Sequence, residues 1–138
     1  MGHEQRLNQQ ISQWTVQALT RLLATFAILQ GVGIVLGGPT RWVGPAFALA
    51  LSVPGAPATW GITLGALGAL ALAGTFTARH TLTGLACVAI GAWSLFFAGS
   101  FLITALGSST AATTGIFAYG HLCVLACTLG VAYWKSAP

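Results

Sequence analysis

The chain has 138 residues, of which 56% are hydrophobic and only 4% are charged, and its formal net charge is +4. Soluble domains are about one quarter charged, so this composition excludes a water-soluble globule. Glu4 is the only acid, which excludes chemistry that needs paired carboxylates, and the basic residues stand singly between apolar runs, which argues against a nucleic-acid-binding patch.

Residues 1–14 are polar and predict a short amphipathic helix. Leu7, Ile11, Trp14 and Ala18 recur at helical spacing, with Gln and Asn between them. Such a helix either lies on the inner leaflet or extends the first membrane span. The segment lacks the basic-then-apolar order of a secretory signal peptide, so we expect the apolar run that follows to be retained as a span.

Four apolar runs are long enough to cross the membrane, since about 20 helical residues span the hydrocarbon layer. The sequence therefore predicts an all-α, polytopic integral membrane protein in which residues 1–138 form a single four-helix domain. A shorter apolar run at 43–52, between two prolines, is too short to cross, and it forms either an interfacial helix, which we favour, or a re-entrant hairpin. The expected spans are about 15–36, 59–76, 82–106 and 115–134.

The basic residues and the tryptophans predict the same orientation. In a four-span topology four basic residues fall on one side and only Arg41 on the other, which by the positive-inside rule places both termini in the cytoplasm. Aromatic side chains prefer the headgroup layer, and they fall at both expected interfaces. The inner side holds Arg6, Arg21, Arg79 and Lys135 with Trp14, Tyr133 and Trp134, and the outer side holds Trp42 and Trp60.

Small residues recur at helical spacing in three of the spans. They permit the close backbone approach that holds helices together in lipid, where no hydrophobic force acts between helices. The pattern fits either the internal packing of one four-helix bundle or a surface for self-association. The candidate helix-packing residues are Gly33 and Gly37 in the first span, Gly61, Gly65, Ala69 and Ala73 in the second, and Gly91 and Gly99 in the third.

Two polar side chains inside spans are candidate functional residues. Gln30, near the middle of the first span, is expected to hydrogen-bond across helices, with a water-filled path as the alternative. His121, in the fourth span, is expected to be neutral and to bond to a hydroxyl of the neighbouring helix such as Thr104, with a functional role as the alternative. Trp93, among the phenylalanines of the third span, is expected to pack and not to hold a cofactor.

Neither a metal site nor a cofactor is expected. Cys123 and Cys127 share a helix face that His121 cannot join, and we interpret the cysteines as small buried thiols. A transmembrane haem normally needs two axial histidines, but His80 lies near the opposite membrane face from His121 and His3 lies in the polar tail.

Three short segments carry a resemblance to a group of known proteins. They are Gly37-Gly38-Pro39-Thr40-Arg41-Trp42, Val53-Pro54-Gly55 and Trp60-Gly61. With these segments and its arginine-rich ends, the chain resembles the small four-pass membrane proteins of actinobacteria and their phages. The resemblance covers the layout of most of the chain, and it implies holin-like or host-exclusion activity and no catalytic residues.

The sequence supports three functional hypotheses. The first is a non-enzymatic protein of the cytoplasmic membrane that self-associates and is holin-like or membrane-perturbing. The second is an accessory or structural subunit of a larger membrane complex. The third is a small carrier or redox subunit that uses His121. The partners expected are the lipid bilayer with either further copies of the chain or a larger membrane complex.

The predicted topology can be tested with reporter fusions placed after Arg79 and after Pro138. Both positions follow spans that end on the basic side, so both reporters should indicate the cytoplasm. A periplasmic signal at either position would overturn the four-span topology.

Overall fold

A computed structural model describes residues 3–42, 44, 47–107 and 113–136. They form four long helices, α1 (His3–Gly37), α3 (Ala58–Phe76), α4 (His80–Gly107) and α5 (Thr113–Ser136), with the short helices η1 (Pro39–Arg41) and α2 (Ala48–Leu51) between α1 and α3. Each long helix is long and apolar enough to cross a membrane. The prediction of an all-α, four-span membrane protein is therefore confirmed.

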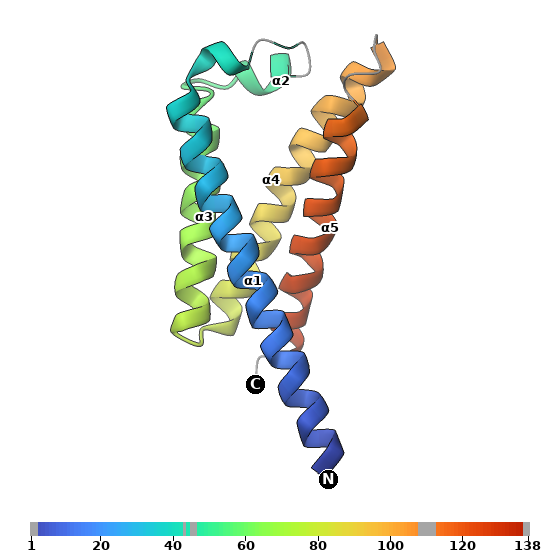
Figure 1. Cartoon of the computed structure of the whole chain (residues 1–138). Helices are drawn as coiled ribbons and strands as arrows, with labels where there is room; N and C mark the ends of the chain where they lie inside the picture. Colours follow the sequence, from blue (N-terminus) through green and yellow to red (C-terminus); the bar gives the residue numbers. More distant parts are fainter. Residues whose placement is uncertain (1–2, 43, 45–46, 108–112, 137–138) are drawn as a thin grey trace.

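The four helices form an elongated bundle with both chain termini at one end, which we call the terminal end (Figure 1). The turn between α3 and α4, residues 77–79, also lies there, and Ala78 in this turn has a positive φ of 53°. The short helices η1 and α2 lie at the opposite end, which we call the α2 end (Figure 1). Successive long helices thus run in opposite directions, as four crossings require.

The polar N-terminal segment is part of the first long helix. α1 is continuous over 35 residues, so the segment extends the first span, which was one of the two expected placements. Figure 1 shows the first turns of α1 reaching beyond the ends of the other helices. Trp14 on this extension is 78% exposed, as suits an amphipathic ring in the headgroup layer.

The segment after α1 folds over the α2 end of the bundle. Residues 43, 45 and 46 of the expected interfacial segment lie outside the described residues, and the rest includes the single turn of α2. Ala50 in this turn is fully buried, and its carbonyl oxygen accepts a 2.7 Å hydrogen bond from the indole Nε1–H of Trp60. This bond ties α2 to the first turn of α3.

An aromatic cluster fills the interior at the α2 end. Phe97 of α4 is fully buried at its centre, with Trp42, Trp60 and Tyr119 at ring-centroid distances of 5.5–5.7 Å and Trp93 at 4.3 Å. Trp42 lies at the α2 end, where the outer interface is expected, but it is only 7% exposed and faces the protein interior. Its ring packs inside the protein because Phe97 offers it an edge-to-face contact.

Helices α1 and α3 form one close pair through glycines. A Cβ atom added to Gly31 would lie 2.5 Å from the carbonyl oxygen of Gly61, and one added to Gly68 would lie 2.7 Å from that of Ala24. Real Cβ atoms do not approach an oxygen so closely, so only glycine allows these backbones to meet. In a bilayer such close contact is the main source of helix–helix attraction.

Helices α4 and α5 form a second close pair by the same means. A Cβ atom on Gly84 would meet the carbonyl oxygen of Gly130 at 3.2 Å, and one on Gly130 would meet that of Gly84 at 3.0 Å. Further along, a Cβ atom on Gly91 would lie 2.7 Å from the Sγ atom of Cys127. Of the expected packing residues in the third span, Gly91 therefore lies at a helix contact.

The remaining small residues divide between the α1–α3 contact and the outer surface. A Cβ atom on Gly31 would lie 2.7 Å from the backbone nitrogen of Gly65, so the backbone of Gly65 does meet α1. On α3 the buried positions are Gly61, Leu64, Gly68, Ala71 and Gly74, which are separated by steps of three or four residues and so stay on one face of the helix. A strict four-residue step drifts off that face, so Ala69 and Ala73 are exposed and a Cβ atom on Gly65 would meet nothing within 4 Å. Open space also surrounds the Cβ positions of Gly33 and Gly99, and Gly37 is the half-buried last residue of α1.

Two single-methyl substitutions should separate glycines that pack from glycines that do not. Gly68→Ala forces a methyl group against the Ala24 carbonyl, and overpacking of this kind costs about 1–3 kcal/mol. Gly33→Ala is the matched control in α1, because its methyl group enters open space. Thermal unfolding in a mild detergent should show a lower midpoint for Gly68→Ala alone. Equal midpoints for the two variants would contradict the α1–α3 contact.

Candidate functional site

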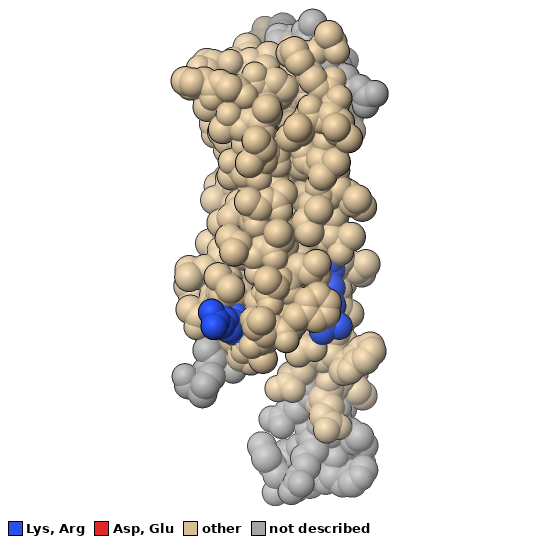
Figure 2. Space-filling model, turned by 90° about the vertical axis from the view of Figure 1, so that its left-hand side faces the viewer, with Lys and Arg blue, Asp and Glu red and all other residues tan. Residues whose placement is uncertain are grey.

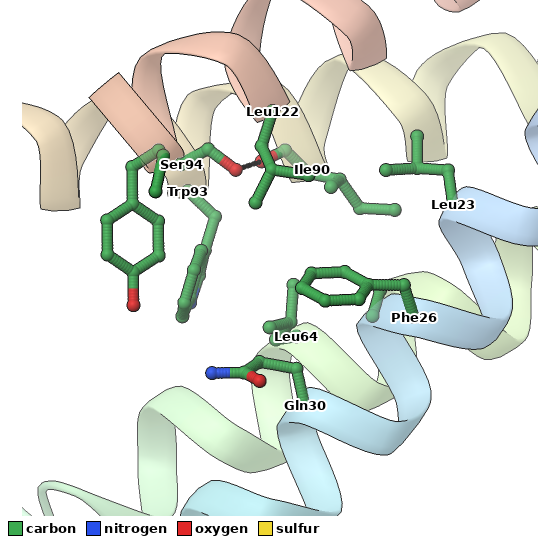
Figure 3. A pocket seen from close by; sticks show the side chains of 11 residues that line it. Leu23, Phe26, Gln30, Leu64, Ile90, Trp93, Ser94 and Leu122 are labelled. Carbon is green, nitrogen blue, oxygen red and sulfur yellow. Dashed lines mark hydrogen bonds between the residues drawn. The ribbon is translucent and has the colours of Figure 1, made fainter. Parts of the chain in front are cut away.

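A cavity of about 210 Å³ lies between the two helix pairs, and all four long helices contribute to its wall (Figure 3). Its lining is mostly apolar, and none of the lining side chains is charged. Trp93, on the wall, lies 13 residues after the start of α4 and 14 before its end, so the cavity is near the middle of the span. It therefore lies at membrane depth, between the two helix pairs.

Trp93 gives this cavity an unusual polar group. The indole is 6% exposed, and its Nε1–H is buried without a hydrogen-bond partner among the described residues. The ring is held in place by Phe97, 4.3 Å away between centroids, and by Tyr119 at 5.9 Å. An unpaired donor in an apolar interior costs free energy of about 1–3 kcal/mol, so an arrangement that holds one in place calls for an explanation.

Two further polar side chains face the same space. Ser94 is buried, and its hydroxyl donates a 2.9 Å hydrogen bond to the carbonyl of Ile90 one turn earlier in α4. Gln30 of α1 is half-buried, and Figure 3 shows its amide extending into the cavity from the side opposite Ser94. The candidate residue Gln30 thus lies at the cavity, while the cross-helix hydrogen bond expected for it is not among those of the described residues.

His121 lies on a different surface. Its side chain is exposed on the outer face of α5, beside Phe117, Val124 and Leu125 in an open, apolar depression. Its Nδ1 atom lies 2.6 Å from the carbonyl oxygen of Phe117 in the same helix. The expected hydrogen bond to Thr104 was wrong, because the His121 ring lies on the exposed face of α5 and bonds within its own helix.

The cysteines and His80 do not form a metal site among the described residues, where no group of three His, Cys, Asp or Glu side chains comes together. Cys87 is fully buried, and Cys123 and Cys127 are half-buried along the α4–α5 contact. His80 stands at the terminal end, where its ring lies 5.8 Å from that of Tyr133. His80 and His121 belong to opposite halves of the bundle and share no site.

The second surface of interest is a shallow groove on the outside of the α1–α3 pair. Small residues of α3 form its floor, with Gly65 half-buried and Ala66 and Ala69 exposed. Along its α1 side stand the exposed side chains of Val32 and Leu36. The groove holds about 460 Å³ and has no charged lining residue, so it faces the lipid hydrocarbon.

Comparison with known proteins gives no relative: no family model, no curated protein and no solved structure matches the chain.

Sequence reasoning did not identify Trp93 as a site residue, or Gly31, Gly68, Gly84 and Gly130 as contact residues. The depth of Trp93 in its span was visible in the sequence, but its lack of a hydrogen-bond partner depends on neighbours from three other helices. The contact glycines could have been found by a search for steps of three and four in place of steps of four only.

Substitution of His121 should leave the fold unchanged. Its ring contacts lipid and its hydrogen bond stays within α5, so we expect both His121→Gln and His121→Leu to unfold within about 0.5 kcal/mol of the wild type. Thermal unfolding monitored by tryptophan fluorescence would measure this. A large loss in the leucine variant alone would show that the ring bonds to a partner outside α5.

Proposed function

We propose that this protein is a non-enzymatic, self-associating protein of the cytoplasmic membrane, with holin-like or membrane-perturbing activity. The observation that carries the proposal is the groove of small residues on the lipid side of α3. Small residues at spacings of four allow a further helix to approach closely, as Gly31 and Gly61 do inside the bundle. On the outside, Ala69 and Ala73 are exposed and the Cβ position of Gly65 is open, so this face offers the same opportunity to a further helix.

The partner that best suits this surface is a second copy of the chain. A symmetric dimer needs a patch that is complementary to itself. Here a ridge formed by Val32 and Leu36 stands beside the groove floored by Gly65 and Ala69. Rotation by a two-fold axis brings the ridge of one copy over the groove of the other, which satisfies the condition for an isologous contact.

The extension of α1 supports the membrane-perturbing part of the proposal. It carries exposed Ile11 and Trp14 beside the polar side chains of Gln10, Ser12 and Gln13. An amphipathic helix of this kind inserts its apolar side at the headgroup boundary. Lateral assembly would concentrate several such extensions on one membrane face.

The charge distribution supports the proposed orientation. Arg21 of α1, Arg79 in the α3–α4 turn and Lys135 of α5 lie toward the terminal end. Figure 2 shows the blue basic groups of one face gathered toward that end. Arg21 also places its guanidinium carbon 5.0 Å from the ring centroid of Phe76, which suits a cation near the hydrocarbon boundary. By the positive-inside rule this end is cytoplasmic.

Gly65→Leu should weaken self-association without unfolding the protein. The new side chain fills the groove where a second copy would approach, and its Cβ atom has no atom of its own chain within 4 Å. Helix contacts in membranes contribute about 1 kcal/mol, so a dimer should dissociate roughly fivefold more readily. Förster transfer between donor- and acceptor-tagged copies in proteoliposomes, measured while the protein is diluted with lipid, would report the change.

Gly33→Leu is the control for this experiment, because it adds the same side chain to an exposed helix position away from the groove. It should leave the energy transfer at the wild-type level. A wild-type protein that stays monomeric at high protein-to-lipid ratio would contradict self-association. Co-purification of a different membrane protein, lost in Gly65→Leu, would instead support the accessory-subunit hypothesis.

The proposed membrane-perturbing activity can be tested separately by measuring the membrane potential of cells that express the protein. Expression of the wild type should lower the membrane potential, as reported by a potential-sensitive dye, and Gly65→Leu at equal membrane abundance should lower it less. An unchanged potential on wild-type expression would contradict membrane perturbation while leaving self-association standing.

A further inference from the structure

The cavity beside Trp93 plays no part in self-association, because it lies between the helix pairs and the groove lies outside them. We propose that this cavity is a binding site for an uncharged, flat, lipid-soluble molecule that carries a ring carbonyl, a quinone-type compound, and that the Trp93 indole donates a hydrogen bond to that carbonyl.

The unpaired indole indicates what the ligand must supply. The indole Nε1–H of Trp93 can only donate a hydrogen bond. It has no acceptor among the described residues, although only 6% of the residue is exposed. Water is scarce at the middle of a bilayer, so bulk solvent does not satisfy this group. A ligand with an acceptor oxygen would remove the cost of the unpaired donor.

The other polar groups are consistent with a neutral oxygen acceptor. The Gln30 amide extends into the cavity from the opposite side and has two N–H donors (Figure 3). The Ser94 proton is already committed to the Ile90 carbonyl, so the donors available to a ligand come from Trp93 and Gln30. Because no lining side chain is charged, an ionic ligand would be desolvated without a counter-charge.

The shape and size of the cavity favour a planar ring. Aromatic side chains stand on several sides of it, with Trp93 and Tyr119 from α4 and α5 and Phe26 from α1. Flat aromatic walls contact a flat ring over a large area. The volume of about 210 Å³ exceeds the roughly 150 Å³ of an engineered cavity that binds benzene, which leaves room for one or two fused rings.

The proposed route from the bilayer passes between α1 and α5. These two helices make few contacts with each other, because α1 packs chiefly on α3 and α5 chiefly on α4. Phe26, on the α1 side of the cavity, is 46% exposed to the lipid surroundings. A ring could therefore enter laterally, and a hydrocarbon tail could remain in the bilayer.

The proposal can be tested by indole N–H resonances of the full chain in detergent micelles. The chain has five tryptophans, so a ¹⁵N-labelled sample gives five indole signals, and Trp93→Phe assigns the one of interest by its loss. Addition of menadione, a naphthoquinone without a tail, should move the Trp93 indole proton downfield in a saturable manner. The other four indole signals should move less.

A comparison of two probe molecules shows whether binding depends on the hydrogen bond to Trp93 or only on burial of an apolar ring. 2-Methylnaphthalene has the same ring system without carbonyls, and it should bind roughly fivefold more weakly. Gln30→Leu and Trp93→Phe should each weaken menadione binding by a similar factor while the midpoint of thermal unfolding remains close to that of the wild type. Gln30→Leu keeps the indole signal, so it tests the site even if Trp93→Phe does not fold.

Methyl decanoate distinguishes a ring ligand from a membrane lipid, since it offers an ester carbonyl on a flexible chain. Tighter binding of methyl decanoate than of menadione would assign the cavity to acyl lipids and overturn the quinone-type ligand. Equal binding of menadione and 2-methylnaphthalene would overturn the hydrogen bond. An unmoved Trp93 signal up to the solubility limit of menadione would overturn the site.

Discussion

The close approach of helix backbones at glycine is the constraint on which the rest of this structure depends. Lipid solvates apolar side chains as well as a protein interior does, so burial of leucine gives the helices no reason to associate. Contact must come from tight packing: the carbonyl oxygen of Gly61 reaches the position that any side chain on Gly31 would occupy, and that of Gly130 comes within 3.2 Å of a Cβ position on Gly84. The protein is accordingly organised as two close pairs, α1 with α3 and α4 with α5.

The way in which these pairs join explains where the cavity lies. At the terminal end the three-residue turn 77–79 holds α3 against α4. At the α2 end the ring of Phe97 contacts Trp60 of one helix pair and Tyr119 of the other. Between these two connections the pairs are held by larger side chains such as Leu64 and Ile90, which do not fill the space completely. Tight packing within each pair and looser packing between them thus leave an opening near mid-membrane.

The sequence predicted the spans well, because hydropathy and length act locally and need no knowledge of neighbours. It predicted the contact faces poorly. In a chain with 18 glycines many regular spacings arise, and the four-residue step through Ala69 and Ala73 selected the lipid side of α3. Likewise His121 was correctly placed within the fourth span, but the direction of its side chain was not predicted, because it depends on how α5 packs against α4. Gln30 was located correctly near mid-span, although the cavity it faces requires four helices to form.

The polar groups of the spans show how Trp93 differs from the hydroxyls of the described residues. In hydrocarbon a polar group must find its partner within the protein, and most of the described hydroxyls do so inside their own helix, as Thr20 does at Val16 and Ser94 at Ile90. His121 follows the same pattern at Phe117. Because these hydroxyl and imidazole groups bond within their own helix, they form no hydrogen bonds between helices. Helix association then depends on how closely the helix surfaces fit together. An indole has no acceptor within reach of its own backbone turn, and Trp93 therefore depends on whatever occupies the adjoining cavity.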